Sequence, residues 1–77
     1  MQSSPEIDLH EFTVAEAKKY LDSFIAALPK GTKELEVIHG FNRGSTLQKF
    51  VRTDYKNKRV EKKILGLNQG STIFMLK

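Results

Sequence analysis

The sequence predicts an α/β domain, a two-layer βαβαββ sandwich in which two helices pack on one face of a four-stranded mixed sheet. Two amphipathic helical patterns alternate with short apolar stretches of strand length. A chain of 77 residues without a cysteine builds one domain around a single modest core. Helices laid on one face of a sheet are the simplest layered arrangement of these elements, and the pattern leaves the order of the strands open.

We expect residues 6–77 to form this single domain and residues 1–5 to be a flexible N-terminal segment, because the residues before Pro5 offer little to bury. The segment has neither the basic nor the apolar part of a secretion signal, and no apolar run is long enough to cross a bilayer. The chain is therefore expected to be a mature, cytoplasmic protein with no membrane partner. The sequence carries no signal for an oligomeric state.

The first strand and the first helix follow from an alternating pattern and a capping box. Residues 6–10 alternate apolar with polar side chains, as a short strand does. Thr13 and Glu16 have the spacing at which each side chain accepts a hydrogen bond from the other's backbone N–H, so a helix is expected to begin there. The helix ends at Pro29-Lys30-Gly31, and its apolar stripe consists of Val14, Ala17, Leu21, Phe24, Ile25 and Leu28.

A second strand over residues 35–39 is predicted to run parallel to the first, because one helix connects them and such crossovers are right-handed. The second helix is expected to begin at Ser45 or Thr46, either of which can cap it, and to end near residues 55–57. The helix is expected to bury Leu47, Phe50 and Val51.

Two further strands complete the sheet. Residues 59–65 and 72–76 are rich in apolar and β-branched side chains. Residues 66–70 between them begin and end with glycine, which suits the unusual backbone angles of a hairpin connection.

A glycine-bracketed loop follows the second strand and points to a ligand. The strand ends at His39, Gly40 and Gly44 bracket the loop, and Arg43 lies inside it just before the second helix. Backbone N–H groups, a helix start and an Arg at one point are a recognised arrangement for holding phosphate. The predicted phosphate contacts are Gly40, Phe41, Asn42, Arg43, Gly44, Ser45 and Thr46.

Two alternatives stay open for this loop. The glycines can serve only to permit a tight turn. Phe41 at the tip of the loop either stacks on an unpaired base or packs back against the second helix.

Positive charge is concentrated in the second half of the chain. Residues 1–42 carry four Lys against seven acids, whereas residues 43–63 carry eight Lys or Arg against two acids. That density suits a polyanion, and Lys49 and Arg52 in the second helix are predicted to join the nucleic-acid contact. A merely solvated basic surface is the alternative. The eight cations are Arg43, Lys49, Arg52, Lys56, Lys58, Arg59, Lys62 and Lys63.

Three titratable residues are expected at one edge of the sheet. Asp8 and His10 lie two apart at the end of the first strand and share a face opposite Ile7 and Leu9, while His39 ends the second strand. The carboxyl ends of parallel strands meet at the edge where open α/β sheets bind ligands. We therefore predict a polar cluster of Asp8, His10 and His39 at that edge.

Two short motifs, in a fixed order, carry a family resemblance. Residues 7–10 read Ile-Asp-Leu-His and are followed by Thr13-Val14 and Glu16-Ala17, while residues 37–40 read Val-Ile-His-Gly with Gly44 beyond them. In combination and spacing these motifs strongly resemble the Smr domain, the small MutS-related module, over residues 6–77.

The resemblance implies a two-layer βαβαββ fold similar to the C-terminal domain of a bacterial translation initiation factor. It also implies binding of DNA or RNA, and nicking or endoribonuclease activity is described for some members of the family. Residues 7–10 match the family's leucine-aspartate-any-histidine motif with Ile in place of leucine. The histidine-glycine motif and its glycine-rich loop match His39, Gly40 and Gly44.

The chain departs from the family pattern at two positions. Many members have glycine directly after the first histidine, where this chain has Glu11, and the inner glycine of their loop falls near Asn42. A carboxylate at Glu11 would repel a phosphate if it pointed into the site. Asn42 can adopt the left-handed backbone conformation of a glycine, so the loop shape is compatible with it. Nucleic-acid binding is therefore better supported than cleavage.

Cleavage of a phosphodiester would assign a role to each residue of the cluster. His10 would act as base or acid while Asp8 holds it, and His39 would be the second titratable group. Arg43 and the backbone amides of residues 44–46 would grip the phosphate. Metal-assisted and metal-independent hydrolysis both stay open, because a metal site of Asp8, His10 and His39 is conceivable but its spacing implies none. No cofactor is predicted.

A structural interpretation of the same residues also stays open. Asp8 and His10 can simply bond one another and close the end of the strand, and His39 can orient the loop without doing chemistry. The predicted function is a nucleic-acid-binding Smr-like domain, and nicking endonuclease or endoribonuclease activity on DNA or structured RNA stays open. The alternatives are a non-catalytic module associated with RNA or the ribosome and a domain that binds a protein or a small phosphorylated ligand.

Overall fold

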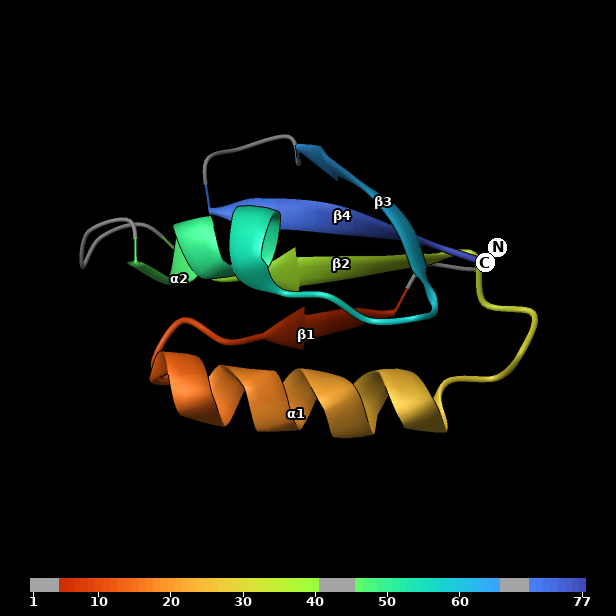
Figure 1. Cartoon of the computed structure of the whole chain (residues 1–77), viewed down its shortest axis with the longest axis horizontal. Helices are drawn as coiled ribbons and strands as arrows, with labels where there is room; N and C mark the ends of the chain where they lie inside the picture. Colours follow the sequence, from red (N-terminus) through yellow and green to blue (C-terminus); the bar gives the residue numbers. More distant parts are fainter. Residues whose placement is uncertain (1–4, 41–45, 66–69) are drawn as a thin grey trace.

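A computed structural model describes residues 5–40, 46–65 and 70–77. Within these ranges four strands form one mixed sheet, and helical segments lie against it (Figure 1). The α/β class and the βαβαββ order predicted from the sequence are confirmed. In chain order the elements are β1 (Glu6–Asp8), α1 (Val14–Ala27), β2 (Glu34–Ile38), α2 (Thr46–Lys49), the π-helical turn η1 (Phe50–Asp54), β3 (Val60–Leu65) and β4 (Ser71–Leu76).

The strands lie in the order β1-β2-β4-β3. β1 and β2 are parallel, as predicted, while β4 pairs antiparallel with both β2 and β3. The carboxyl ends of β1 and β2 therefore lie at the same edge of the sheet as the first residues of β4. Asp8, Ile38 and Ser71 are direct neighbours across these three strands.

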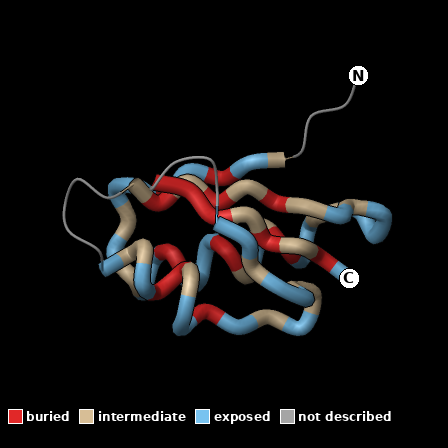
Figure 2. The backbone as a smooth tube through the Cα atoms, turned by 90° about the horizontal axis from the view of Figure 1, so that it is seen from above, coloured by how far each residue is buried: buried red, intermediate tan, exposed pale blue. Residues whose placement is uncertain are grey.

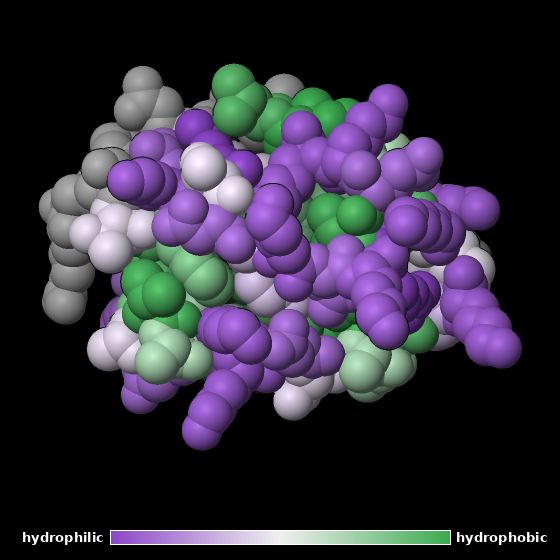
Figure 3. Space-filling view, in the orientation of Figure 1, coloured by the Kyte–Doolittle hydropathy of each residue, from purple (hydrophilic) through white to green (hydrophobic). Residues whose placement is uncertain are grey.

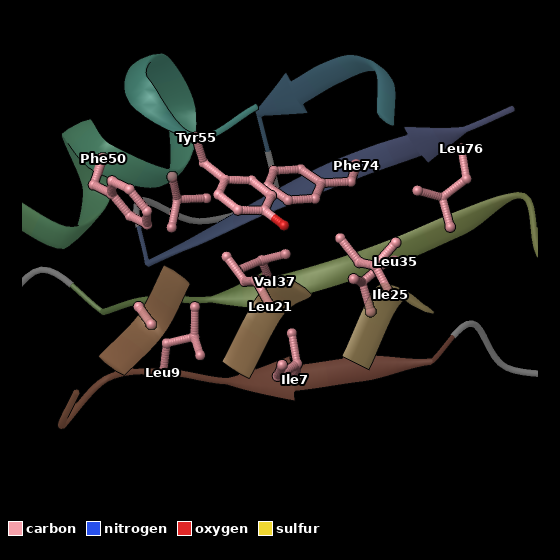
Figure 4. Packing of buried hydrophobic residues seen from close by; sticks show 12 residues of the cluster. Ile7, Leu9, Leu21, Ile25, Leu35, Val37, Phe50, Tyr55, Phe74 and Leu76 are labelled. Atoms are coloured by element: carbon pink, nitrogen blue, oxygen red, sulfur yellow. The ribbon is translucent and has the colours of Figure 1, made fainter. Parts of the chain in front are cut away.

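One face of the sheet carries the core. Leu35 and Val37 of β2 are fully buried, as is Phe74 of β4, and they belong to the same cluster as Leu21 of α1 and Val51 of η1. Figure 4 shows these side chains meeting between the sheet and the helical layer. Buried and less buried residues alternate along β2 and β4 (Figure 2), as they do in strands covered on one side. Both helical segments thus cover the same face, as predicted.

Helix α1 forms as its sequence predicts. The backbone N–H of Glu16 donates to Thr13 Oγ1 at 3.2 Å, and the N–H of Thr13 donates to Glu16 Oε1 at 3.0 Å, so both halves of the capping box are present. Three stripe residues are fully buried and the other three are partly buried against the core: Ala17, Leu21 and Ile25, then Val14, Phe24 and Leu28. In the part of the chain that is described, no helix is long and apolar enough to cross a membrane.

The second helical pattern gives two short segments where one continuous helix was predicted. After one turn of α2 the backbone widens, and the Tyr55 N–H donates to the Phe50 carbonyl at 2.7 Å, five residues earlier. The wider turn places Tyr55 over the sheet, where its ring stacks on Phe74 with centroids 5.8 Å apart. Its hydroxyl donates to Asp22 Oδ1 of α1 at 2.6 Å. Burial raises the pKa of Tyr55 above its ordinary value, so this hydroxyl stays a donor.

The first strand ends at Asp8, two residues earlier than predicted. The His10 backbone N–H donates to the Asp8 carboxylate at 3.0 Å, and the Phe12 N–H donates to the Leu9 carbonyl at 2.9 Å. These local bonds replace the strand ladder and turn the chain toward α1. The predictions for residues 1–4, 41–45 and 66–69 lie outside the described residues.

Candidate functional site

The predicted edge brings Asp8, His10 and Gly40 together, and we call these three residues the His10 edge. Asp8 ends β1, His10 follows it after one residue, and Gly40 lies two residues beyond the end of β2. Gly40 has a φ of +71°, and a Cβ added there would lie 3.2 Å from the Cβ of His10. A side chain at position 40 would therefore be strained both by the backbone and by this contact. Glycine lets the exit from β2 lie directly against His10.

Asp8 holds the imidazole of His10 in place. Nδ1 of His10 lies 2.6 Å from Asp8 Oδ1, the same oxygen that accepts from the His10 backbone N–H. Both side chains are about half exposed, at 55% for His10 and 54% for Asp8. The hydrogen bond that His10 donates to Asp8, helped by the charge of Asp8, raises the pKa of His10, and the hydrogen bonds from the side chain and backbone of His10 lower the pKa of Asp8. A protonated imidazole beside an ionised carboxylate is thus the favoured state.

Glu11 occupies the other side of the same ring. Its Oε2 lies 3.2 Å from His10 Nε2, and its side chain is 74% exposed. Glu11 also contributes to the raised pKa of His10. The carboxylate of Glu11 therefore lies beside the ring nitrogen that would otherwise be free to donate to a ligand. One imidazolium and two carboxylates give this spot a net charge of about −1.

His39 is in the opposite situation, because it is buried with 2% of its surface exposed. Nδ1 lies 2.9 Å from the Gly40 carbonyl, and Nε2 lies 2.9 Å from Thr72 Oγ1. A carbonyl can only accept, so Nδ1 carries the proton and Nε2 of the neutral ring accepts from the Thr72 hydroxyl. Burial lowers the pKa of His39, and the charge of Arg52 lowers it further.

Arg52 completes this buried network. Its Nε–H donates to Thr72 Oγ1 at 2.8 Å, and its Nη2–H donates to the Ser71 carbonyl at 2.9 Å. The hydrogen bonds run from Arg52 through Thr72 to His39 and on to the Gly40 carbonyl. Both ring nitrogens of His39 are used, so the geometry favours the interpretation in which this histidine orients the loop.

The start of β4 belongs to the site, although the sequence analysis did not select it. The carbonyl of Gly70 accepts from the N–H groups of both His39 and Gly40, at 2.8 and 2.9 Å. Thr72 lies on the buried face of β4 in phase with Phe74. A threonine at a position of the strand where the neighbouring core residues are apolar indicates a buried hydroxyl that needs a hydrogen-bond partner. This was the sequence signal that could have identified Thr72.

Of the remaining predicted contacts, Thr46 and Lys49 are exposed at the two ends of α2. Phe41, Asn42, Arg43, Gly44 and Ser45 lie outside the described residues. Among residues 5–40, 46–65 and 70–77, no three His, Cys, Asp or Glu side chains are grouped so that they could hold a metal ion.

Three of the eight cations of the predicted basic footprint serve the fold. Arg52 has the bonds described above, and the Arg59 guanidinium donates to the carbonyls of Ile25, Leu28 and Pro29 at the end of α1. Lys63 donates to the Tyr55 carbonyl and lies 5.6 Å from the centre of the Phe74 ring. Burial lowers the pKa of Lys63. Among the described cations of this footprint, those that stay exposed are Lys49, Lys56, Lys58 and Lys62.

The comparisons with known proteins agree with this geometry. The family model described as the Smr domain matches residues 7–72. The crystal structure of the Smr domain of Thermus thermophilus MutS2 is similar, with a TM-score of 0.78 and 29% sequence identity over 95% of this chain and 98% of that one. No curated protein matches the sequence. The match of the family model over most of its length shows that the chain belongs to the Smr domain family.

Proposed function

We propose that this Smr domain binds nucleic acid at the His10 edge. The observation that carries the proposal is the exposed imidazole of His10, which Asp8 keeps in one orientation and favours in its charged form. A charged N–H donor forms short, strong hydrogen bonds with phosphate oxygens. Gly40 lies against this ring and begins the loop that carries the other predicted phosphate contacts.

A phosphate must replace Glu11 to reach His10. The Glu11 side chain is largely exposed and lies 3.2 Å from the Nε2 that the phosphate would take as its donor. An exposed side chain can rotate away without breaking core contacts. Because the carboxylates of Asp8 and Glu11 repel phosphate, affinity at this edge depends on cations elsewhere on the domain that attract the polymer.

Fluorescence anisotropy with labelled single-stranded RNA, single-stranded DNA and duplex DNA at low salt tests the proposal. The wild-type domain should bind at least one of these polymers, and His10→Ala should weaken that binding about tenfold to a hundredfold, as expected for a lost charged hydrogen bond. Ser23→Ala, an exposed change on α1, is the matched control and should bind like the wild type. Unchanged affinity of His10→Ala would place the contact elsewhere.

Cleavage of the bound strand is the second candidate function, and the 2.6 Å bond between Asp8 and His10 favours it. A protonated, oriented imidazole can act as general acid for the leaving oxygen. His39 offers no free nitrogen for the base step. The attacking group, a water or a ribose hydroxyl of the substrate, must therefore be activated by another residue acting as base or by a bound metal ion.

Supercoiled plasmid and structured RNA, each incubated with and without EDTA, separate these possibilities. Nicked plasmid or new RNA ends that disappear with His10→Gln, while affinity persists, would support cleavage by His10. Loss of the products in EDTA would indicate a metal-assisted reaction. Binding that leaves both polymers intact would identify a non-catalytic module.

A further inference from the structure

Positive charge gathers at the end of the sheet opposite the His10 edge. Two backbone bonds assemble this end: the Leu76 N–H donates to the Lys33 carbonyl, and the Lys77 N–H donates to the Arg59 carbonyl, both at 2.8 Å. Figure 1 shows the loop after α1, the start of β3 and the C-terminus meeting there. The exposed lysines at this end, which we call the basic pole, are Lys30, Lys33, Lys58 and Lys77.

Arg59 connects the loop after α1 to the start of β3, and the lysines of the basic pole form no ion pairs among the described residues. By donating to the Ile25, Leu28 and Pro29 carbonyls, at 2.8 to 3.0 Å, its guanidinium ties the start of β3 to the end of α1. Lys58 and Lys30 are thereby held at the same end, although 28 positions separate them in the sequence. No lysine of the basic pole forms an ion pair with a residue that the structure describes.

Acidic residues exclude one path between the basic pole and the His10 edge. Glu34 and Glu36 alternate with the buried Leu35 and Val37 of β2, so they lie on the sheet face that the helices leave open. Glu6 of β1 pairs with Glu36 and shares that face. Asp8 is in phase with Glu6 along β1, so four carboxylates lie on the open face and repel a polyanion.

The helical face offers the other path. The segment from α2 to β3 runs across it from one end of the sheet to the other (Figure 1), and it carries the exposed Lys49, Lys56 and Lys58. Figure 3 shows hydrophilic side chains crowded over this face, in the view where η1 lies in front of the sheet. Along the chain this segment leads from Lys49 past the exposed Asp54 to Lys56 and to Lys58 of the basic pole.

We propose that the basic pole is a second contact for the phosphate backbone of a single nucleic-acid strand that is also bound at the His10 edge. This inference rests on the proposed function. The five residues of β2 span about 13 Å at about 3.3 Å per residue. Even at the rise of about 3.4 Å per nucleotide of a stacked strand, 12 nucleotides are longer than this span.

Anisotropy titrations with a labelled 12-nucleotide RNA and DNA, repeated between about 50 and 200 mM KCl, test the basic pole. The variant is Lys33→Gln with Lys58→Gln, and the matched control is Lys18→Gln with Lys19→Gln on the exposed face of α1. Each pair removes two of the charges that give the chain its net +4. The backbone bonds that involve the Lys33 carbonyl stay intact, and thermal melting checks that both variants fold.

The basic-pole variant should weaken binding about fivefold to tenfold at low salt, and its slope of log affinity against log salt should fall by about 1.4 to 1.8, as for two lost phosphate contacts. The control should change affinity less than about twofold and keep most of the wild-type slope. Equal losses of affinity in the two variants would overturn the proposal that the basic pole contacts nucleic acid. They would leave the proposed binding at the His10 edge unaffected. Absence of wild-type binding at low salt would overturn the proposed function as well.

Polyglutamate competition separates nucleic acid from an acidic protein partner. Polyglutamate at the same charge concentration should displace the RNA weakly, because it lacks the phosphate that the His10 edge takes. Displacement as strong as by unlabelled RNA, lost in the basic-pole variant, would reassign the basic pole to an acidic polypeptide.

Discussion

The two histidines of the family motifs lie at the same edge of the sheet and have opposite surroundings. His10 is half exposed between two carboxylates, which raise its pKa. His39 is buried between the Gly40 carbonyl and the Thr72 hydroxyl, and burial lowers its pKa. A charged, accessible imidazole can meet a ligand, whereas a neutral, enclosed imidazole holds a backbone in place. Of the two motif histidines, His10 is therefore placed to contact a ligand, and His39 is placed to hold the backbone.

The largest expected effect comes from removing the buried histidine. His39→Ala leaves a cavity and takes a partner from Thr72, so the free energy of unfolding should fall by about 2–4 kcal/mol. Urea denaturation followed by circular dichroism measures it. His10→Ala, in contrast, should leave the midpoint nearly unchanged. Similar losses in the two variants would remove the distinction between the two sites.

Thr72→Val tests the same network with a smaller change. The substitution keeps the shape of the side chain but deprives the buried His39 Nε2 and Arg52 Nε of their shared partner, which should cost about 1–2 kcal/mol. Thr53→Val, at an exposed position of η1, is the matched control and should be close to neutral. The 15N chemical shifts of the His39 ring should also show that its single tautomer is lost. A fixed tautomer in Thr72→Val would mean that the Gly40 carbonyl alone orients the ring.

Titration of the two imidazoles by NMR should give clearly different pKa values for His10 and His39. His10 should titrate above the ordinary value of 6.5 and His39 below it. Asp8→Asn should move the titration of His10 downward and weaken nucleic-acid binding at pH 7.5 more than at pH 5.5, since the proton is present in both proteins at the lower pH. Equal loss at both pH values would show that Asp8 acts on binding without acting on the charge of His10.

The same shifts determine how stability depends on pH. The folded pKa of His10 is raised, so its contribution to stability is fully present below about 6.5 and is lost as pH rises through the folded value. For Asp8 the folded pKa is lowered, so its contribution is present above the ordinary 3.8 and is lost as pH falls through the folded value. The contribution of His39 has the opposite pH dependence. Because its folded pKa is lowered, its contribution to the stability of the domain is present above about 6.5 and is lost as pH falls below that value.

The smallest expected effect concerns Glu11. Glu11→Gln removes the carboxylate that lies 3.2 Å from His10 Nε2, so affinity for RNA or DNA should rise about twofold to fivefold, the range of an exposed charge pair. Glu61→Gln on β3, exposed and distant along the sheet, is the control and should change affinity less. A loss of affinity in Glu11→Gln would mean that Glu11 supports binding by keeping His10 charged.

Local patterns were enough to predict much of this molecule. The capping box of Thr13 and Glu16 and the spacing of Asp8 and His10 depend on contacts within three residues, so a pattern can reveal them. Alternation along the strands likewise predicted the sheet and its covered face. The second helix was predicted less well, because its ending depends on Tyr55 reaching both Phe74 and Asp22, which are far away in the sequence.

The sequence predicted least completely which Lys and Arg side chains would be exposed as a basic surface. The density of Lys and Arg over residues 43–63 is a property of the chain, but Arg52, Arg59 and Lys63 are bound to carbonyls of elements that only the fold brings near. In the same way, Lys33 and Lys77 join Lys58 only because β4 ends and β3 begins beside the loop after α1.

The amino-acid sequence alone determined the elements, the facing of their apolar sides and the pairing of Asp8 with His10, because each of these depends on neighbours along the chain. The tertiary structure decided the strand order, the burial of His39, the hydrogen bond that Thr72 makes to it and the hydrogen bond that Arg52 makes to Thr72. Those features join residues about 20 to 33 positions apart, and the free energy of such contacts depends on what the whole fold places around them.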